Sequence, residues 1–162
     1  MPEHDWDPLR RFVSTVATEG QVSLEEQDIR DAQAKLLPLI ETGQMLAQKY
    51  SVVCTNPPYM GSSGMGGTLA EFVKKNYPNS KSDMSTVCME KTISMCKPNG
   101  FMAMINIPVW MFLSSYEKLR TNIISQNTII NMVHPGRGIF GSDFGTTTFV
   151  IGKAHILGYQ GS

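Results

Sequence analysis

Apolar and polar positions follow two patterns along the chain: helical spacings of three and four residues, and short continuous apolar runs. Residues 22–49 show the helical spacing after a candidate N-cap at Ser23, and Pro38 and Gly43 are expected to divide or kink that helix. Short runs rich in β-branched residues and bounded by turn residues predict buried strands. Strands are expected at 51–55, 101–107, 128–134 and 146–154. Three further helices are expected: one at 68–77, one that begins at a cap at Ser82 or Asp83 and stops at 98–100, and one at 114–127.

This order of elements predicts an α/β fold. Strands that alternate with helices form parallel βαβ units, so we expect a mostly parallel sheet with helices on both faces. No helix is expected between the last two strands, which therefore form an antiparallel hairpin at the C-terminal edge. The pattern predicts two parts, a helical N-terminal segment at 1–49 and an α/β part at 50–162.

Composition and charge narrow the class of protein. The chain has 162 residues, 41% of them apolar and 17% charged, which fits one folded globular domain. Fourteen basic residues balance fourteen acidic ones, so a nucleic acid would have to meet a local basic patch. The candidate patches, which are usually plain solvated surface, are Arg10-Arg11, Lys74-Lys75 with Lys81, and Arg137.

The cysteines and apolar runs indicate a cytoplasmic protein. Three cysteines, Cys54, Cys88 and Cys96, give an odd number and no C-x-x-C pair, so we expect reduced thiols that pack as small core residues. The same pattern predicts no metal site. The longest apolar run, 101–113, is too short to cross a membrane, and the N-terminus has no signal-peptide pattern.

Chemistry is concentrated in Asn56-Pro57-Pro58-Tyr59, which directly follows the strand expected at 51–55. Ligands of open α/β sheets bind beyond the carboxyl ends of the strands. Neither proline has an N–H group, so this segment offers carbonyl acceptors at fixed φ, together with an amide oxygen and a tyrosine ring for stacking. The alternative is a rigid turn with a capping amide.

Two acceptors and a stacking ring suit a planar ring that bears an exocyclic amino group. The lone pair of such a nitrogen is delocalised, which makes it a poor nucleophile. Acceptors at Asn56 and at the Pro57 carbonyl would hold both hydrogens, favour a pyramidal nitrogen and stabilise the positive charge that grows during attack. No metal and no strongly basic side chain is required.

Around these residues the chain resembles N6-adenine DNA methyltransferases, in which N-P-P-Y is the catalytic motif. The stretches "KYSVVCTNPPYMG", "KSDMSTVCMEKTISMCKPNGFMAMI", "PVWMFLSSYEKLR" and "GTTTFVI" follow one another as in the large enzymes of BREX phage-defence type. The resemblance covers about residues 48–152 and implies a partial Rossmann-like methyltransferase sheet. It also implies S-adenosylmethionine as cofactor and double-stranded DNA with a flipped adenine as substrate.

Residue roles follow from the resemblance. Asn56, Pro57, Pro58 and Tyr59 would be catalytic, with Tyr59 stacked on the base, and Asn56 and Pro58 would also touch the cofactor. Phe140, with Phe144 in reserve, would form a second aromatic wall for the base. Asp83 and Glu90 match a further family motif, but a helix cap and an exposed helix face are the preferred interpretations.

The family's glycine-rich cofactor turn and its acidic partner, both upstream of N-P-P-Y, are missing. The G-x-G-x-x-G match at 136–141 precedes a strand instead of opening a helix, so it is interpreted as a false positive. The loop at 61–67 is expected to be a mobile flap or a flexible surface loop. We therefore expect a fragment of a methyltransferase of a restriction-modification or phage-defence system, lacking the cofactor half and a target-recognition domain and inactive alone.

Two other functions stay open. N-P-P-Y also serves methyltransferases that act on protein glutamine or on RNA, because these substrates present a planar amino group as well. A non-catalytic interaction or DNA-binding module derived from a methyltransferase would explain the missing cofactor loop. A truncated sheet would expose an unpaired strand edge, which predicts a weak homodimer.

Overall fold

The computed structural model describes residues 6–15, 24–136, 138, 145–156 and 158–159. The chain divides into two compact units, Met1–Gln48 and Lys49–Ser162. The residues expected to form a second aromatic wall, Phe140 and Phe144, lie outside the described residues, as do parts of the G-x-G-x-x-G match.

The first unit is a helical hairpin formed by α1 (Trp6–Ser14) and α2 (Leu24–Ala47). Arg10 Nη2 lies 3.3 Å from Glu41 Oε1, and Ile40 of α2 is buried. The expected division of the second helix at Pro38 is wrong, because α2 runs through this residue without a break. Pro38 lacks the N–H that would bond the Ala34 carbonyl, but the rest of α2 is held by its packing against α1. α1 lies in the segment 1–49 that was expected to be helical, although the sequence pattern predicted no bounds for a separate first helix.

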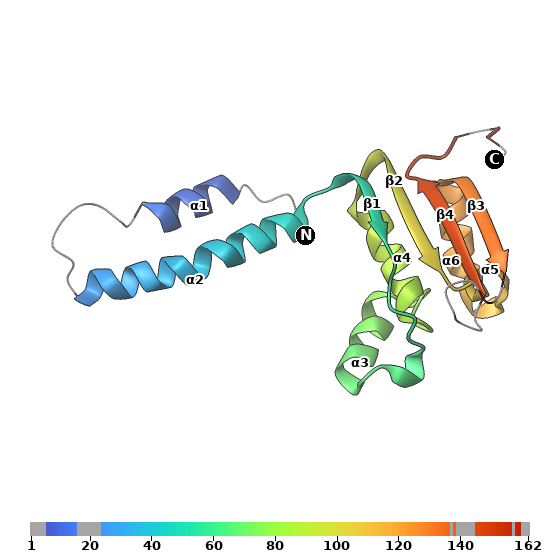
Figure 1. Ribbon diagram of the computed structural model, residues 1–162, viewed down its shortest axis with the longest axis horizontal. Coiled ribbons are helices and arrows are strands. Elements are labelled where there is room, and N and C mark those ends of the chain that lie inside the picture. The colour runs from blue at the N-terminus through green and yellow to red at the C-terminus, as the bar shows by residue number, and fades with distance from the viewer. Residues whose placement is uncertain (1–5, 16–23, 137, 139–144, 157, 160–162) are drawn as a thin grey trace. The chain divides into compact units, whose positions relative to one another are not determined.

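The second unit contains a four-stranded sheet in the order β1-β2-β4-β3 (Figure 1). The strands are β1 (Tyr50–Thr55), β2 (Cys96–Asn106), β3 (Thr128–Gly136) and β4 (Thr146–Gly152). β1 and β2 are parallel, whereas β4 is antiparallel to both of its neighbours. The α/β class and the antiparallel pairing of the last two strands are confirmed, but the sheet is mixed instead of mostly parallel, because only β1 and β2 pair in parallel. β4 is inserted beside β2, so β3 forms that edge of the sheet and β1 forms the other.

The core of this unit lies where α4 (Met84–Met95) and α6 (Glu117–Gln126) pack against the sheet. Met102, Met104 and Phe149 from the strands are at most 2% exposed. Helices were expected on both faces, but both α4 and α6 contribute to this one core. Side chains on neighbouring positions of the strands are much more open, with Val52 61% and Phe101 44% exposed.

The turn that joins α4 to the sheet is shorter than expected. The helix ends at Met95, and Cys96 already begins β2, so residues 98–100 lie within the strand instead of ending the helix. Asn99 adopts a positive φ of 60° there. Gly100 is required by a close approach, because an added Cβ would lie 2.9 Å from the Ser51 carbonyl oxygen. This contact places the start of β2 directly against β1.

The remaining described elements are short helices: η1 (Ser62–Gly64), α3 (Gly67–Asn76), α5 (Val109–Phe112) and η2 (Ser114–Tyr116). Of the three cysteines only Cys96 is buried; Cys88 is half-buried and Cys54 is exposed, so the expectation that all three are core residues is wrong for Cys54. Burial raises the pKa of the Cys96 thiol. Among the described helices, none is long and apolar enough to cross a membrane.

Candidate active site

The Asn-Pro-Pro-Tyr segment leaves the carboxyl end of β1, beside the end of β2. Thr55 pairs with Met104, so Asn56 follows the last paired position of β1. Asn56 and Pro58 are exposed, whereas Pro57 between them is buried. No N–H or O–H group of the described residues donates to the Pro57 carbonyl oxygen. At this end of the sheet, where ligands of α/β folds collect, the segment therefore has an exposed Asn56 amide beside a buried Pro57 whose carbonyl accepts no hydrogen bond from the described residues.

Tyr59 folds back toward the amide of Asn56. Its hydroxyl donates to Asn56 Oδ1 at 3.0 Å and lies 3.4 Å from the Ile105 carbonyl oxygen at the end of β2. Partial burial raises the pKa of the Tyr59 hydroxyl, so it remains a hydrogen-bond donor at neutral pH. A carbonyl oxygen has two lone pairs, so Asn56 Oδ1 can accept a second hydrogen bond from a ligand. The ring itself is 42% exposed and is available for stacking.

The loop after Tyr59 is held by the start of α4. Met84 N–H donates to the Met60 carbonyl at 2.8 Å, and Ser62 N–H donates to the Ser82 carbonyl at 2.9 Å. These two bonds flank an antiparallel bridge between Gly61 and Asp83. The segment expected to be a flap or flexible loop contains the helical turn η1, and Met65 within it is buried. The Asn-Pro-Pro-Tyr segment is therefore fixed at both ends, by β1 and by α4.

Asp83 and Glu90 have structural roles at the start and along the length of α4. Asp83 is the N-cap of α4, and its Oδ1 accepts from the Ser85 N–H at 2.8 Å and from the Ser85 hydroxyl at 2.6 Å. The preferred interpretation of Asp83 as a cap is confirmed. Glu90 is half-buried, not fully exposed as expected, and its carboxylate accepts a hydrogen bond from Ser80. Both carboxylates are engaged in holding the segment before α4.

Asn106 was missed by the sequence reasoning. It ends β2 next to the Asn-Pro-Pro-Tyr segment and is fully buried. Its Oδ1 accepts from the Ile107 N–H at 2.7 Å, and its carbonyl accepts from the Thr147 hydroxyl at 3.1 Å. An asparagine in an otherwise apolar run, two residues before Pro108, was the available signal. The side chain turns the chain at the strand end and so fixes the edge on which Ile105 and Tyr59 meet.

The residues that precede β1 do not fit the expected cofactor site. Among the described residues 6–15 and 24–49, all but a few at the ends belong to α1 or α2, and no strand, glycine-rich turn and helix follow one another there. Of the described residues, only Asn56 and Pro58 were expected to touch the cofactor, and both lie after β1. No group of three or more His, Cys, Asp or Glu residues suited to a metal ion is present in the described part of the chain.

Comparisons with known proteins place these features in a wider context. Residues 10–140 match the family described as Eco57I restriction-modification methylase. The chain is 42% identical over 162 residues to the adenine-specific methyltransferase BrxX of Escherichia coli O9:H4 (strain HS). It is 44% identical over 160 residues to the adenine-specific methyltransferase PglX of Lacticaseibacillus casei (strain Zhang). Each alignment covers 96% of this chain, which spans only 13% of the length of either relative.

Solved structures show the same fold. A class I S-adenosylmethionine-dependent methyltransferase from Listeria monocytogenes is 15% identical, with a TM-score of 0.54 over 72% of this chain and 35% of that chain. The ATP-dependent type ISP restriction-modification enzyme LlaBIII, solved bound to DNA, is 14% identical, with a TM-score of 0.54 over 92% of this chain and 11% of that chain. At these identities the likeness concerns the fold.

Proposed function

Because this chain belongs to the Eco57I restriction-modification methylase family, we propose that it supplies the base-holding half of a DNA adenine-N6 methyltransferase active site. The observation that carries the proposal is the grouping of Asn56 Oδ1, the Tyr59 ring and the unused Pro57 carbonyl at the end of β1. The two relatives named adenine-specific methyltransferases support adenine as the base. Since the chain spans 13% of their length, the activity is proposed for a complete enzyme of which this chain is a part.

The adenine amino group would lie between two oxygen acceptors. Asn56 Oδ1 uses its second lone pair for one amino hydrogen, and the Pro57 carbonyl accepts the other. Both dipoles are fixed before the base arrives, so they favour the pyramidal nitrogen and the positive charge that develops on it. Pro58 supplies no N–H that would compete for these oxygens. The flipped adenine would stack on Tyr59, whose hydroxyl is already anchored to Asn56.

The role of Tyr59 can be tested by comparing two substitutions. Tyr59→Ala removes the stacking surface and is expected to weaken binding of DNA with an unpaired adenine by about 1–3 kcal/mol. Tyr59→Phe keeps the ring and loses only the hydroxyl contacts to Asn56 and Ile105, so it should retain most of this affinity. Fluorescence anisotropy with labelled duplexes measures both values. Equal losses for the two variants would contradict stacking as the role of Tyr59.

Cofactor binding is proposed to require residues beyond this chain. The two helices before β1 leave no described strand-to-helix turn that could cradle S-adenosylmethionine. We therefore expect titration calorimetry of the 162-residue chain with S-adenosylmethionine to show no binding in the micromolar range. A micromolar Kd for this chain would show that a cofactor site exists here and would overturn this part of the proposal.

The proposed activity is tested in the complete methyltransferase. Mass spectrometry should detect N6-methyladenine in plasmid DNA, and a glutamine-containing protein acceptor or an RNA acceptor should gain no methyl group. Methylation of protein or RNA alone would favour the other amino-group substrates. Unmodified DNA with retained DNA binding would favour a non-catalytic module, for which the missing glycine turn is the supporting observation. The weak homodimer expected through the free edge of β1 stays a prediction.

A further inference from the structure

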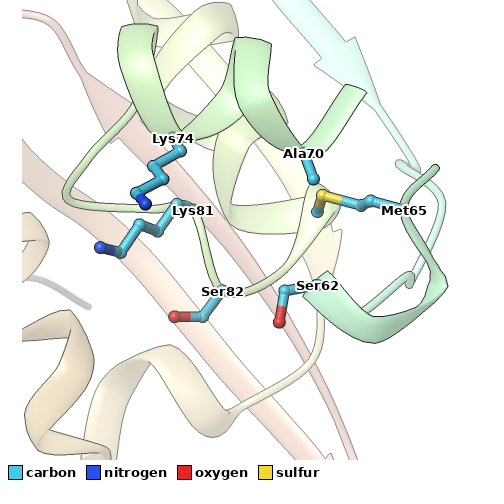
Figure 2. Close-up of a pocket in the computed structure, with 6 residues that line it drawn as sticks. All are labelled: Ser62, Met65, Ala70, Lys74, Lys81 and Ser82. Carbon is cyan, nitrogen blue, oxygen red and sulfur yellow. The ribbon is translucent and has the colours of Figure 1, made fainter. Parts of the chain in front are cut away.

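A cavity opens beside the loop that follows Tyr59. Its volume is about 220 Å³, and it lies between η1, α3 and the segment that leads into α4. This is smaller than the roughly 300–1,000 Å³ of most small-molecule sites. Figure 2 shows the side chains of Lys74 and Lys81 extending toward the same side of the pocket. The lining residues are Ser62, Met65, Ala70, Lys74, Lys81 and Ser82.

The positive charge in this cavity is not neutralised. Among the described residues neither Lys74 nor Lys81 has an ion-pair partner, and Glu71 on the same helix as Lys74 forms no ion pair with it. The carboxylates of Asp83 and Glu90 accept hydrogen bonds from Ser85 and Ser80, and among the described residues neither forms an ion pair with one of these lysines. Two free ammonium groups that line one small cavity favour an anion.

The rest of the lining restricts which anion fits. The hydroxyls of Ser62 and Ser82 add neutral hydrogen-bond donors, as phosphate oxygens require. Met65 and Ala70 contribute an apolar surface that a free inorganic phosphate would not use but that a sugar ring would cover. We propose that this cavity binds one sugar-phosphate unit of a nucleic-acid strand. The proposal rests on the proposed DNA substrate and extends it to a backbone contact.

The position of the cavity along the chain supports this assignment. Ser62 follows Tyr59 by three residues and is hydrogen-bonded through its backbone to Ser82, so the two serines belong to one ordered unit with the catalytic loop. A base stacked on Tyr59 is covalently joined to its own sugar and phosphate, so a phosphate of the same strand must lie close to the loop that follows Tyr59. A phosphate contact next to the base site would fix the register of the strand, whatever its sequence.

Lys75 provides the matched control. It lies beside Lys74 in the last turn of α3, where a basic side chain also stabilises the helix end, but it does not line the cavity. A purely structural role in the helix would therefore affect Lys74→Gln and Lys75→Gln equally. A role in the cavity would affect Lys74→Gln and Lys81→Gln together and leave Lys75→Gln close to the wild type.

The experiment measures DNA binding by the full chain as a function of salt. The probe is a fluorescein-labelled duplex with one unpaired adenine, at 50–200 mM NaCl. Each lost phosphate contact lowers the slope of log K against log salt by about 0.9, which corresponds to roughly eightfold weaker binding at 0.1 M. Because the two lysines are proposed to bind one phosphate, Lys74→Gln/Lys81→Gln should lower the slope by about 0.9 and weaken binding to matched and mismatched duplexes equally. Lys75→Gln should change neither value.

The outcomes separate this inference from the proposed function. Unchanged slopes for the double variant, with Tyr59→Ala still losing its preference for the unpaired adenine, would overturn the phosphate site alone. A reduced slope for the double variant, together with a Tyr59→Ala variant that keeps its preference for the unpaired adenine, would support the phosphate site and count against the base site. Millimolar inorganic phosphate at constant ionic strength is expected not to displace the probe from the wild type or from the double variant. Displacement from the wild type but not from the double variant would show that the site binds free phosphate and would overturn the assignment to a nucleic-acid strand. No measurable DNA binding at 50 mM NaCl would also overturn the inference.

Discussion

Replacement of Asn56 by alanine is expected to lower the kcat of the complete methyltransferase on DNA by about 10²–10³, the usual cost of removing one preorganised hydrogen-bonding group from a site of developing charge. Asn56 Oδ1 is held by the Tyr59 hydroxyl at 3.0 Å and retains one lone pair for the adenine amino group. Its contribution grows as charge develops on the nitrogen, so kcat should fall more than KM rises. Transfer of a labelled methyl group to plasmid DNA measures both constants.

The matched control for this variant is Asn76→Ala. Asn76 is exposed at the end of α3 and donates from Nδ2 to the Phe72 carbonyl at 2.8 Å, so its loss removes an asparagine hydrogen bond away from the Asn-Pro-Pro-Tyr segment. It should leave kcat within about twofold of the wild type, since surface changes away from a site are usually small. An Asn56→Ala enzyme with kcat as high as that of Asn76→Ala would remove the chemical role of the amide.

Phe149→Ala is expected to destabilise the chain by about 3–5 kcal/mol, the range for removal of a buried aromatic side chain. Phe149 is 0% exposed on β4, and its ring meets Trp110 edge-on with centroids 5.3 Å apart. β4 pairs with both β2 and β3, so the cavity would lie between the only two antiparallel pairings of the described sheet. Urea denaturation monitored by Trp fluorescence measures the change in the free energy of unfolding.

Phe112→Ala serves as the comparison for Phe149→Ala. Phe112 is 72% exposed on α5, so its truncation leaves no enclosed cavity and should cost less than about 1 kcal/mol. The difference between the two variants isolates the packing of Phe149 from the general effect of losing a phenylalanine. A loss below about 1 kcal/mol for Phe149→Ala as well would show that β4 is not the packing centre of this unit.

The sequence predicted the elements that short-range patterns specify. Each β-branched or apolar run gave a strand, and Asp83 capped the helix that it was expected to cap. Asn-Pro-Pro-Tyr was placed at the end of a strand because it directly follows "SVVCT", and the structure has it there, after β1. In each case residues adjacent in the chain contain the whole signal.

Features that depend on packing were not predictable in this way. Pro38 does not divide α2, since the helix is also held by its contacts with α1, and those lie about 30 residues away in the chain. The exposure of Cys54 depends on which face of the sheet α4 and α6 cover. Lys74 and Lys81 were interpreted as solvated surface, because their shared cavity exists only when α3 and the start of α4 meet.

The most direct test of the account is a structure of the complete methyltransferase bound to DNA that contains its target adenine. We predict that the adenine is extruded onto the Tyr59 ring, with its amino nitrogen about 3 Å from both Asn56 Oδ1 and the Pro57 carbonyl oxygen. An adenine bound with its amino group away from these two oxygens would contradict the account.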